Sequence, residues 1–165
     1  IIYGISEHGL SEDLKISYKE AKDYIDNYYL KHPAIKEFMM SAVENAKQTG
    51  IAKTIFGRTR KMFDISSSNY MIRSRAERAS QNMPLQGSAA DIIKMAMVTI
   101  HRRLKEEGLK AQMIMQVHDE LNFNVPIAEV DRVRDIVVSE MQNVVHLTVP
   151  LIADCGVGSN WLQAH

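Results

Sequence analysis

Apolar and polar residues alternate along two neighbouring stretches of the chain, with a short polar break between them. The first stretch is Met113–Val117. In the second stretch, apolar side chains occupy every second position, at Leu121, Phe123 and Val125. Alternation with a period of two on both sides of a short break predicts a β-hairpin. The break is His118-Asp119-Glu120, so two adjacent carboxylates stand at the predicted tip.

Other segments repeat their apolar residues at helical spacing. The predicted helices cover residues of about 18–31, 33–49, 69–82, 85–108 and 128–144. Ser17 and Glu20 have the spacing of a capping box before the first helix. Pro33 suits the first position of the second helix, and Gly50 ends it. Pro84 is predicted to break or kink the helical pattern around it.

The strands predicted elsewhere are short. Residues 51–62, which contain Phe56-Gly57, predict two strands around a turn, and Leu151–Gly158 predicts a last strand. Helices and antiparallel strands are therefore mixed along the chain. This mixture indicates an α+β fold, in which an antiparallel β-sheet with the acidic hairpin packs on long α-helices.

Length and composition limit the classes of protein that the chain can represent. Its 165 residues form one domain or a large part of one, and its 20 basic and 20 acidic residues cancel. No apolar run approaches the roughly 18 residues of a membrane span, and no signal peptide is evident. The single Cys155 excludes an internal disulfide, which favours a cytoplasmic setting. The chain starts inside the apolar run Ile1–Ile5 and is interpreted as a fragment.

The acidic pair at the hairpin tip has two interpretations. Ionised carboxylates are hard oxygen ligands suited to Mg²⁺ or Mn²⁺, and His118 beside them adds a donor for phosphate or sugar. Alternatively, Asp119 and Glu120 are solvated acids of an ordinary turn, since Asp is common in turns. A two-metal site would also need a further carboxylate from another element.

A basic segment covers residues 53–78. It holds seven cations against two acids, and three aromatic residues are interleaved with them. Such a segment can follow a phosphate backbone. The alternative is a solvated helix face with ion pairs such as Arg73–Glu77. The cations are Lys53, Arg58, Arg60, Lys61, Arg73, Arg75 and Arg78.

A row of polar side chains follows the basic segment. Arg78 and Asn82 are four residues apart and share a helix face, and Gln86 extends the row if the kink at Pro84 is mild. Arg, Asn and Gln are side chains that read base edges by hydrogen bonding. In the alternative interpretation they cap helix ends around Pro84.

Three stretches of the chain stand out together: Ile1–Ser6, Glu77-Arg78 with Asn82–Asp91, and Gln116–Glu120. They resemble family A DNA polymerases of the bacterial DNA polymerase I type. The first is similar to the end of the fingers helix, the second to the entry of a long palm helix, and the third to the third polymerase motif. Phe56-Gly57-Arg58 and Gly156–Trp161 fit in the same order, so the resemblance spans nearly all 165 residues.

This resemblance implies roles for residues around the active site. Asp119 would be catalytic and would bind a metal ion, and Glu120 would be a nearby supporting carboxylate. His118 would contact the primer end, and Tyr3 would pack at the nascent base pair. The implied fold is a polymerase palm, at residues 67–165, and fingers-derived helices with a short β-hairpin, at residues 1–66.

The resemblance also implies DNA contacts. Arg78, Asn82 and Gln86 would line the minor groove of a primer–template, where the acceptors are nearly alike for all base pairs. Arg58 and its basic neighbours would hold the template backbone. The implied partners are primer–template DNA, deoxynucleoside triphosphates and the missing N-terminal part of the same polymerase, with no membrane.

The implied reaction is addition of a deoxynucleotide to a primer 3′ end by two-metal phosphoryl transfer, with two Mg²⁺ ions in the intact parent. The family's second metal-binding Asp would lie before Ile1, so the fragment alone is expected to be inactive. Two rival functions stay open, a metal-dependent phosphodiester hydrolase and a non-catalytic nucleic-acid-binding module.

Overall fold

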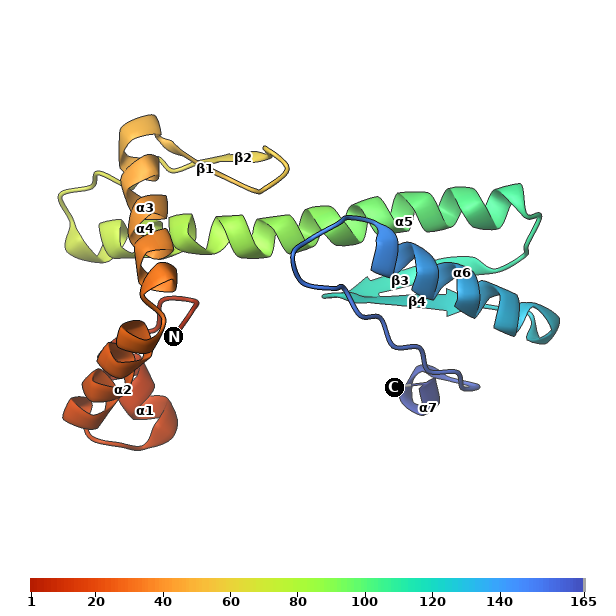
Figure 1. Cartoon of the computed structure of the whole chain (residues 1–165), viewed down its shortest axis with the longest axis horizontal. Coiled ribbons are helices and arrows are strands. Elements are labelled where there is room, and N and C mark those ends of the chain that lie inside the picture. Colours follow the sequence, from red (N-terminus) through yellow and green to blue (C-terminus); the bar gives the residue numbers. More distant parts are fainter. Residues whose placement is uncertain (165) are drawn as a thin grey trace. The chain divides into compact units, whose positions relative to one another are not determined.

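The computed structural model describes residues 1–164 (Figure 1). Its backbone contacts divide the chain into two compact units, Ile1–Ser88 and the residues from Ala89 onward. Helices combine with small antiparallel sheets, so the predicted α+β fold is confirmed. Within the described part of the chain, no helix is long and apolar enough to cross a membrane.

The first unit begins with three helices whose ends follow from their capping residues. Helix α1 covers Glu7–Leu14, and α2 covers Tyr18–Lys31 after the predicted capping box, in which Ser17 and Glu20 bond each other's backbone N–H groups. Helix α3 covers Pro33–Thr49. It ends because Gly50 adopts a left-handed conformation with φ of 71°, which costs glycine little.

A short hairpin and a fourth helix complete this unit. Strand β1 (Ile51–Lys53) pairs antiparallel with β2 (Thr59–Lys61), as predicted. Helix α4 (Tyr70–Asn82) starts where the side chain of Asn69 accepts hydrogen bonds from two backbone N–H groups. A small apolar core joins these elements, and its buried members are Ala46, Ala52, Met62, Ile65 and Ala76.

The helical backbone does not break at Pro84. Residues Met83–Gly87 form a π-helical turn, labelled η1, between α4 and α5 (Ser88–Glu106). Proline has no N–H, and a π turn is one way in which a helix accommodates an irregular hydrogen-bond pattern. The hydroxyl of Ser88 donates to the carbonyl of Pro84, which satisfies an acceptor in this turn.

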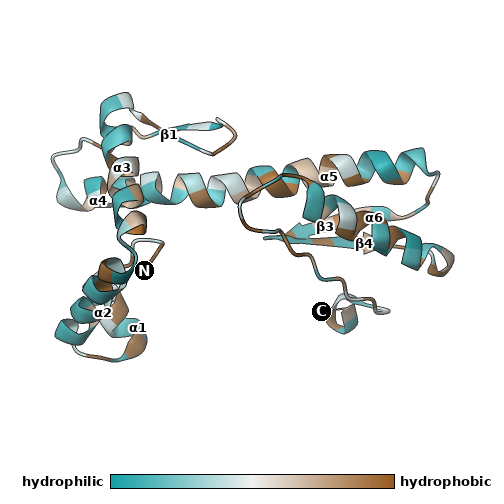
Figure 2. Cartoon of the chain, viewed as in Figure 1, coloured by the Kyte–Doolittle hydropathy of each residue, from teal (hydrophilic) through white to brown (hydrophobic). Residues whose placement is uncertain are grey.

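The second unit contains α5 and the predicted hairpin. Strand β3 (Gln112–Val117) pairs antiparallel with β4 (Glu120–Asn124), and the register places Val117 opposite Glu120. A short 3₁₀ turn, η2 (Ile127–Glu129), leads into α6 (Val130–Asn143). The helices in Figure 2 carry hydrophobic residues interspersed with hydrophilic ones, as expected for elements with one buried face.

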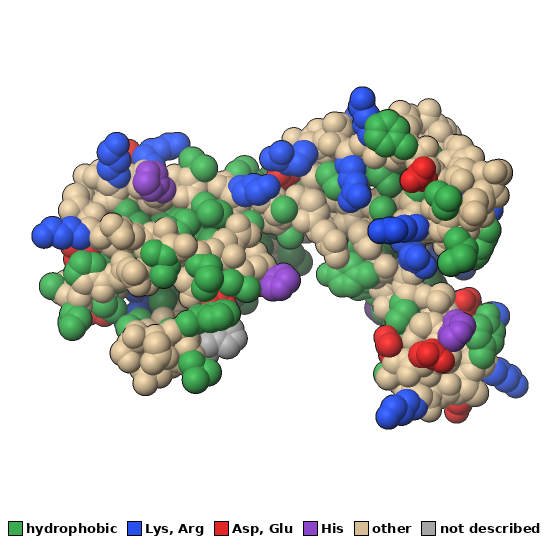
Figure 3. All heavy atoms as spheres, turned by 180° about the vertical axis from the view of Figure 1, so that it is seen from behind, with side chains coloured by type: hydrophobic (Ala, Val, Ile, Leu, Met, Phe, Trp, Pro, Cys, Tyr) green, Lys and Arg blue, Asp and Glu red, His purple; other side chains and the backbone are tan. Residues whose placement is uncertain are grey.

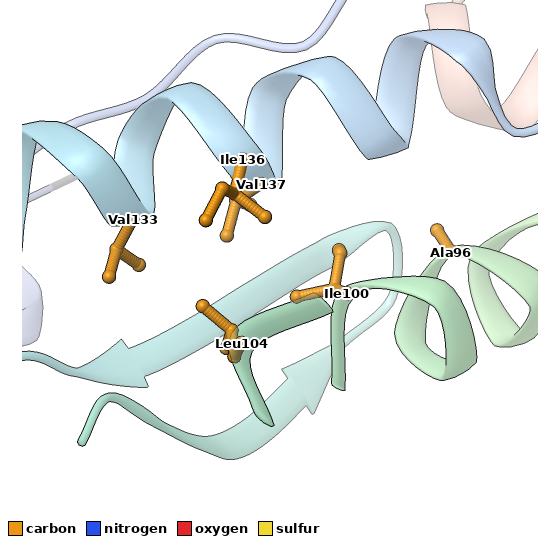
Figure 4. Packing of buried hydrophobic residues seen from close by; sticks show 6 residues of the cluster. All are labelled: Ala96, Ile100, Leu104, Val133, Ile136 and Val137. Atoms are coloured by element: carbon orange, nitrogen blue, oxygen red, sulfur yellow. The ribbon is translucent and has the colours of Figure 1, made fainter. Parts of the chain in front are cut away.

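The core of this unit lies between α5 and α6. Figure 4 shows side chains of the two helices pointing toward one another. Ile100 and Ile136 are fully buried, at 0% and 1% exposure. Met113, Leu121 and Phe123 of the hairpin pack against this cluster, so the predicted inner face of the hairpin is the buried one.

The ends of the chain differ from the sequence expectations. The strand predicted at Leu151–Gly158 is wrong, because this segment carries no strand pairing and the carbonyl of Ala153 instead faces the Gln142 amide at 3.5 Å. Helices α1 and α7 (Trp161–Ala164) were not predicted. Ile1–Gly4 forms a turn closed by a 2.8 Å backbone hydrogen bond, and the resemblance of Ile1–Ser6 to the end of the fingers helix stays an expectation.

The expected division into residues 1–66 and 67–165 concerns the domains of a larger polymerase and stays a prediction. The contact units described above are divided at a different place, after Ser88.

Candidate active site and nucleic-acid interface

The tip of the β3–β4 hairpin is a two-residue turn made by His118 and Asp119. His118 has φ of 54°, a left-handed conformation that histidine tolerates better than bulky or β-branched residues do. The side-chain amide of Gln116 donates to the carbonyl of His118 at 2.9 Å and supports the turn. A tight turn with a side-chain brace holds its two exposed side chains at a defined place on the sheet.

The two carboxylates at the tip have different surroundings. Asp119 is exposed, and it makes no hydrogen bond or ion pair with other described residues. Glu120 is half-buried at the start of β4, and its Oε1 accepts a hydrogen bond from the indole Nε1 of Trp161 at 2.6 Å. Asp119 is therefore available to an external cation, whereas Glu120 is already held by a neutral donor.

The side chains at the tip are of a type that binds Mg²⁺, but they are too few to form a complete site. Carboxylate oxygens are the ligands that Mg²⁺ prefers. Within residues 1–164, however, no three His, Cys, Asp or Glu side chains come together as a metal-binding group. The hairpin can therefore supply Asp119, with Glu120 nearby, as part of a site whose other ligands come from elsewhere.

Arg58, in the first unit, lies in an ordered loop between β1 and β2. The buried side chain of Thr54 accepts hydrogen bonds from the backbone N–H groups of Phe56 and Arg58, at 3.3 and 3.2 Å. The N–H of Ile55 donates to the hydroxyl of Ser88 at 3.0 Å, which ties the loop to the end of η1. The polar sequence of this loop thus fixes the backbone that carries Arg58.

The basic segment, residues 53–78, presents most of its cations to solvent. Figure 3 shows Lys and Arg side chains spread over the surface of the first unit. Five of the cations are exposed and form no ion pair with the rest of the described chain, which leaves them available to phosphate. These five are Lys53, Arg60, Lys61, Arg75 and Arg78.

The alternative ion pair Arg73–Glu77 does not form. Glu77 pairs instead with Lys47 of α3, at 2.8 Å, and Arg73 donates to the carbonyl of Ser67 at 2.8 Å. Arg73 also lies over the ring of Tyr70, 5.7 Å from its centroid. Arg73 is thus used to order the loop before α4, while the remaining cations of the segment face outward.

The N-terminal turn packs against α4. Gly4, next to Tyr3, has φ of 75°, and a β-carbon built on it would lie 3.2 Å from Cγ of Arg78 and 3.1 Å from Oε1 of Gln81. Tyr3 itself is 61% exposed. The turn that carries Tyr3 therefore lies against the part of α4 that carries Arg78.

Asn82 and Gln86 flank the π turn. Gln86 is exposed within η1, whereas Asn82 is half-buried and its Oδ1 has no hydrogen-bond partner in the described chain. Buried polar atoms in proteins are usually hydrogen-bonded, so this amide is an exception. Arg78 and Asn82 belong to α4 and Gln86 to η1, and a continuous helical backbone joins these two elements.

One residue near the hairpin was not assigned a role from sequence. Trp161 is the only tryptophan of the chain, and its indole N–H usually seeks an acceptor when it is partly buried. That property is the signal that could have drawn attention to it. The acceptor, Glu120, lies 41 residues earlier and is identified only by the fold.

Comparison with known proteins gives consistent matches. The sequence model described as DNA polymerase family A matches residues 1–163. The chain is 46% identical over 163 residues to DNA polymerase I of Caldicellulosiruptor bescii, and 46% identical over 164 residues to DNA polymerase I of Bacillus caldotenax. Each match covers 99% of this chain but 19% of the relative, so the chain spans about a fifth of their length.

A solved structure is similar over the same range. It is the polymerase domain of Pol1 from M. smegmatis in complex with a DNA primer–template and dNTP. Its TM-score is 0.94 at 39% sequence identity, and the match covers 99% of this chain and 29% of that one.

Proposed function

The chain belongs to DNA polymerase family A, and from this premise we propose that it is part of a DNA-directed DNA polymerase that adds deoxynucleotides to a primer 3′ end. Residues 1–66 are proposed to come from the fingers and residues 67–165 from the palm. The observation that carries the proposal is the exposed, unpaired carboxylate of Asp119 on a braced hairpin turn.

We propose Asp119 as a ligand for catalytic Mg²⁺, with Glu120 as the supporting carboxylate. When bound, two such ions in the intact polymerase would stabilise the charge that develops at the attacking oxygen and the phosphate. The chain's own contribution is to hold one carboxylate at a fixed position. His118, at the same turn, is proposed to contact the primer end, where its exposed imidazole can donate to phosphate or sugar.

The first unit is proposed to bind the primer–template. Arg78, Asn82 and Gln86 offer donors and acceptors that suit the minor groove, whose acceptors change little between base pairs. Arg58 and the other outward cations are proposed to contact the template phosphates. Tyr3 is proposed to pack at the nascent base pair, because its ring is exposed and the neighbouring Gly4 packs against Arg78.

The proposed site is incomplete in this chain. Two metal ions and a triphosphate need several anionic and cationic ligands, and Asp119 and Glu120 supply only some of them. The remaining groups, including a second metal-binding Asp, are proposed to belong to the part of the polymerase that precedes residue 1.

Replacement of Asp119 by Asn in the longer parent polymerase tests this function. We expect primer extension to fall by several orders of magnitude, because the substitution removes a charged metal ligand but keeps the shape of the side chain. Asp23→Asn is the matched control, since Asp23 is also exposed and stands on α2, in the other compact unit.

Two results would favour the rival functions. Undiminished primer extension by the Asp119→Asn polymerase would overturn the catalytic role and favour a non-catalytic nucleic-acid-binding module. Metal-dependent cleavage of DNA by the chain, without nucleotide addition by the parent, would favour a phosphodiester hydrolase.

A further inference from the structure

The hydrogen bond between Trp161 and Glu120 links the C-terminal segment to the proposed catalytic hairpin. The indole Nε1 of Trp161 donates to Oε1 of Glu120 at 2.6 Å. Trp161 remains 49% exposed, so this contact is not simply a consequence of burying an aromatic ring in the core. The hydrogen bond, rather than burial of the ring, therefore defines how Trp161 relates to the carboxylate next to Asp119.

A local hydrogen-bond network shapes the segment that carries Trp161. The side-chain oxygen of Gln163 accepts hydrogen bonds from the backbone N–H and the hydroxyl of Ser159, at 3.1 and 2.5 Å. The side chain of Asn160 accepts one from the backbone N–H of Gln163 at 3.1 Å. These bonds bracket Trp161 on both sides and hold the short helix α7 in one conformation.

Two glycines allow α7 to lie directly against the preceding backbone. A β-carbon on Gly158 would lie 2.6 Å from Cβ of Gln163, and one on Gly156 would lie 1.8 Å from the carbonyl oxygen of Ala164. Real β-carbons do not approach other atoms so closely, so any other residue would push α7 away. The sequence Gly156-Val157-Gly158 is therefore suited to docking the turn that presents Trp161.

The indole donor has a specific electrostatic consequence for Glu120. An Arg or Lys at this place would pair with the carboxylate and cancel much of its charge. A neutral N–H fixes the orientation of one oxygen and adds no positive charge of its own. Because Glu120 directly follows Asp119, its orientation determines where that charge lies relative to a cation bound at the tip.

We propose that Trp161 is a positioning residue that holds the Glu120 carboxylate in a fixed orientation next to the Mg²⁺ ligand Asp119. This proposal rests on the proposed polymerase function. Residues that hydrogen-bond to groups around a metal commonly change metal affinity or activity by about 10- to 100-fold when they are replaced.

The bond itself can be tested without any reaction. The chain has one tryptophan, so the indole N–H gives one signal in a ¹⁵N-edited NMR spectrum of the ¹⁵N-labelled 165-residue chain. We expect Glu120→Ala to shift this signal upfield and to accelerate its exchange with solvent. Glu106→Ala, at an exposed glutamate on α5, is the control and should leave the signal unchanged. If Glu120→Ala changes neither the chemical shift nor the solvent exchange of the indole N–H, the proposal is overturned.

The positioning role is tested in the longer parent polymerase with Trp161→Phe, which keeps an aromatic ring but removes the donor. We expect the Mg²⁺ concentration for half-maximal nucleotide addition to rise by about tenfold, with primer–template affinity unchanged. Leu162→Ala, at the next residue and 88% exposed, should behave like the wild type.

A double substitution separates positioning from general damage. If Trp161 acts through Glu120, Trp161→Phe should have no further effect in a Glu120→Ala background. Additive losses, or an unchanged Mg²⁺ requirement in Trp161→Phe, would overturn the proposal while leaving the polymerase function intact. Failure of the function itself would show separately, as unimpaired synthesis by Asp119→Asn.

Discussion

Arg132 and Glu107 form a two-point ion pair, in which Nε of Arg132 donates to Oε2 of Glu107 and Nη2 donates to Oε1, each at 2.6 Å. The pair joins the first turn of α6 to the residue after α5. Arg103 approaches the same carboxylate at 3.4 Å. The hydrogen bonds from Arg132 lower the pKa of Glu107 most. Desolvation opposes them, but the charge of Arg132 and the contribution of Arg103 add to the lowering, so the pKa lies below its usual value.

This pair predicts a loss of stability in acid. A carboxyl group whose pKa is lower in the folded chain stabilises it above the unfolded-state pKa of about 4.3, and this contribution disappears as the pH falls through the folded-state pKa. The free energy of unfolding, measured in urea, should therefore be higher for the wild type than for Glu107→Gln near neutral pH. This difference should shrink as the pH falls well below the unfolded-state pKa.

The neighbouring Glu106 gives the control for this measurement. Glu106→Gln, at an exposed residue without a described ion pair, should follow the wild type at each pH. The difference is expected to be modest, because exposed ion pairs contribute little to stability. An equal response of the two Gln variants would refute a special role for the Arg132 pair.

The core between α5 and α6 predicts a larger effect. Ile136 is 1% exposed and faces Ile100, so Ile136→Ala should lower the free energy of unfolding by about 2–5 kcal/mol. Ile127→Ala removes the same atoms at a residue that is 93% exposed. It should change the free energy of unfolding by about 0.5 kcal/mol or less. Chemical denaturation of both variants checks the contrast, and similar losses would contradict the packing.

Elements with local end signals were predictable from sequence. Helix α3 begins at Pro33 and ends at Gly50 because these residues set the backbone angles themselves, whatever surrounds them. The acidic hairpin was predicted because apolar residues alternate on both sides of a short polar break. The alternation did not reveal the register shift between Met113 and Met115 in β3. Helix α1 was missed because Gly9 interrupts a short segment with few apolar residues, although Ser6 caps it.

Features that depend on distant partners could not be predicted in the same way. The apolar residues near Leu151 suggested a strand, but a strand requires a neighbour to pair with, and periodicity does not say whether one exists. The partner of Trp161 is likewise set by the fold. Pro84 was expected to disturb the helix, yet the hydroxyl of Ser88 and a π turn accommodate it.

The incompleteness of the proposed site predicts that the purified 165-residue chain does not extend a primer. Asp119 and Glu120 are present, but two metal ions and a triphosphate would lack most of their ligands. A primer-extension assay with the parent polymerase under the same conditions is the control. Template-directed synthesis by the 165-residue chain alone would contradict both the prediction and the proposed location of the missing ligands.

The outward cations of the basic segment predict weak, salt-sensitive binding of primer–template DNA by residues 53–86. Phosphate contacts release counterions, so the logarithm of the binding constant should fall linearly with the logarithm of the salt concentration. Arg60→Ala and Arg75→Ala should each weaken binding across all DNA sequences. Each should also make the slope of this line shallower by about one, the amount expected for the loss of one phosphate contact.

Lys19→Ala is the matched control, because Lys19 is an exposed cation of the same unit, on α2 and outside the basic segment. Its salt dependence should equal that of the wild type. Fluorescence anisotropy over a range of salt concentrations measures the lines of the wild type and of the three variants. Binding that does not change with salt, or an equal effect of Lys19→Ala, would show that the segment does not follow the phosphate backbone.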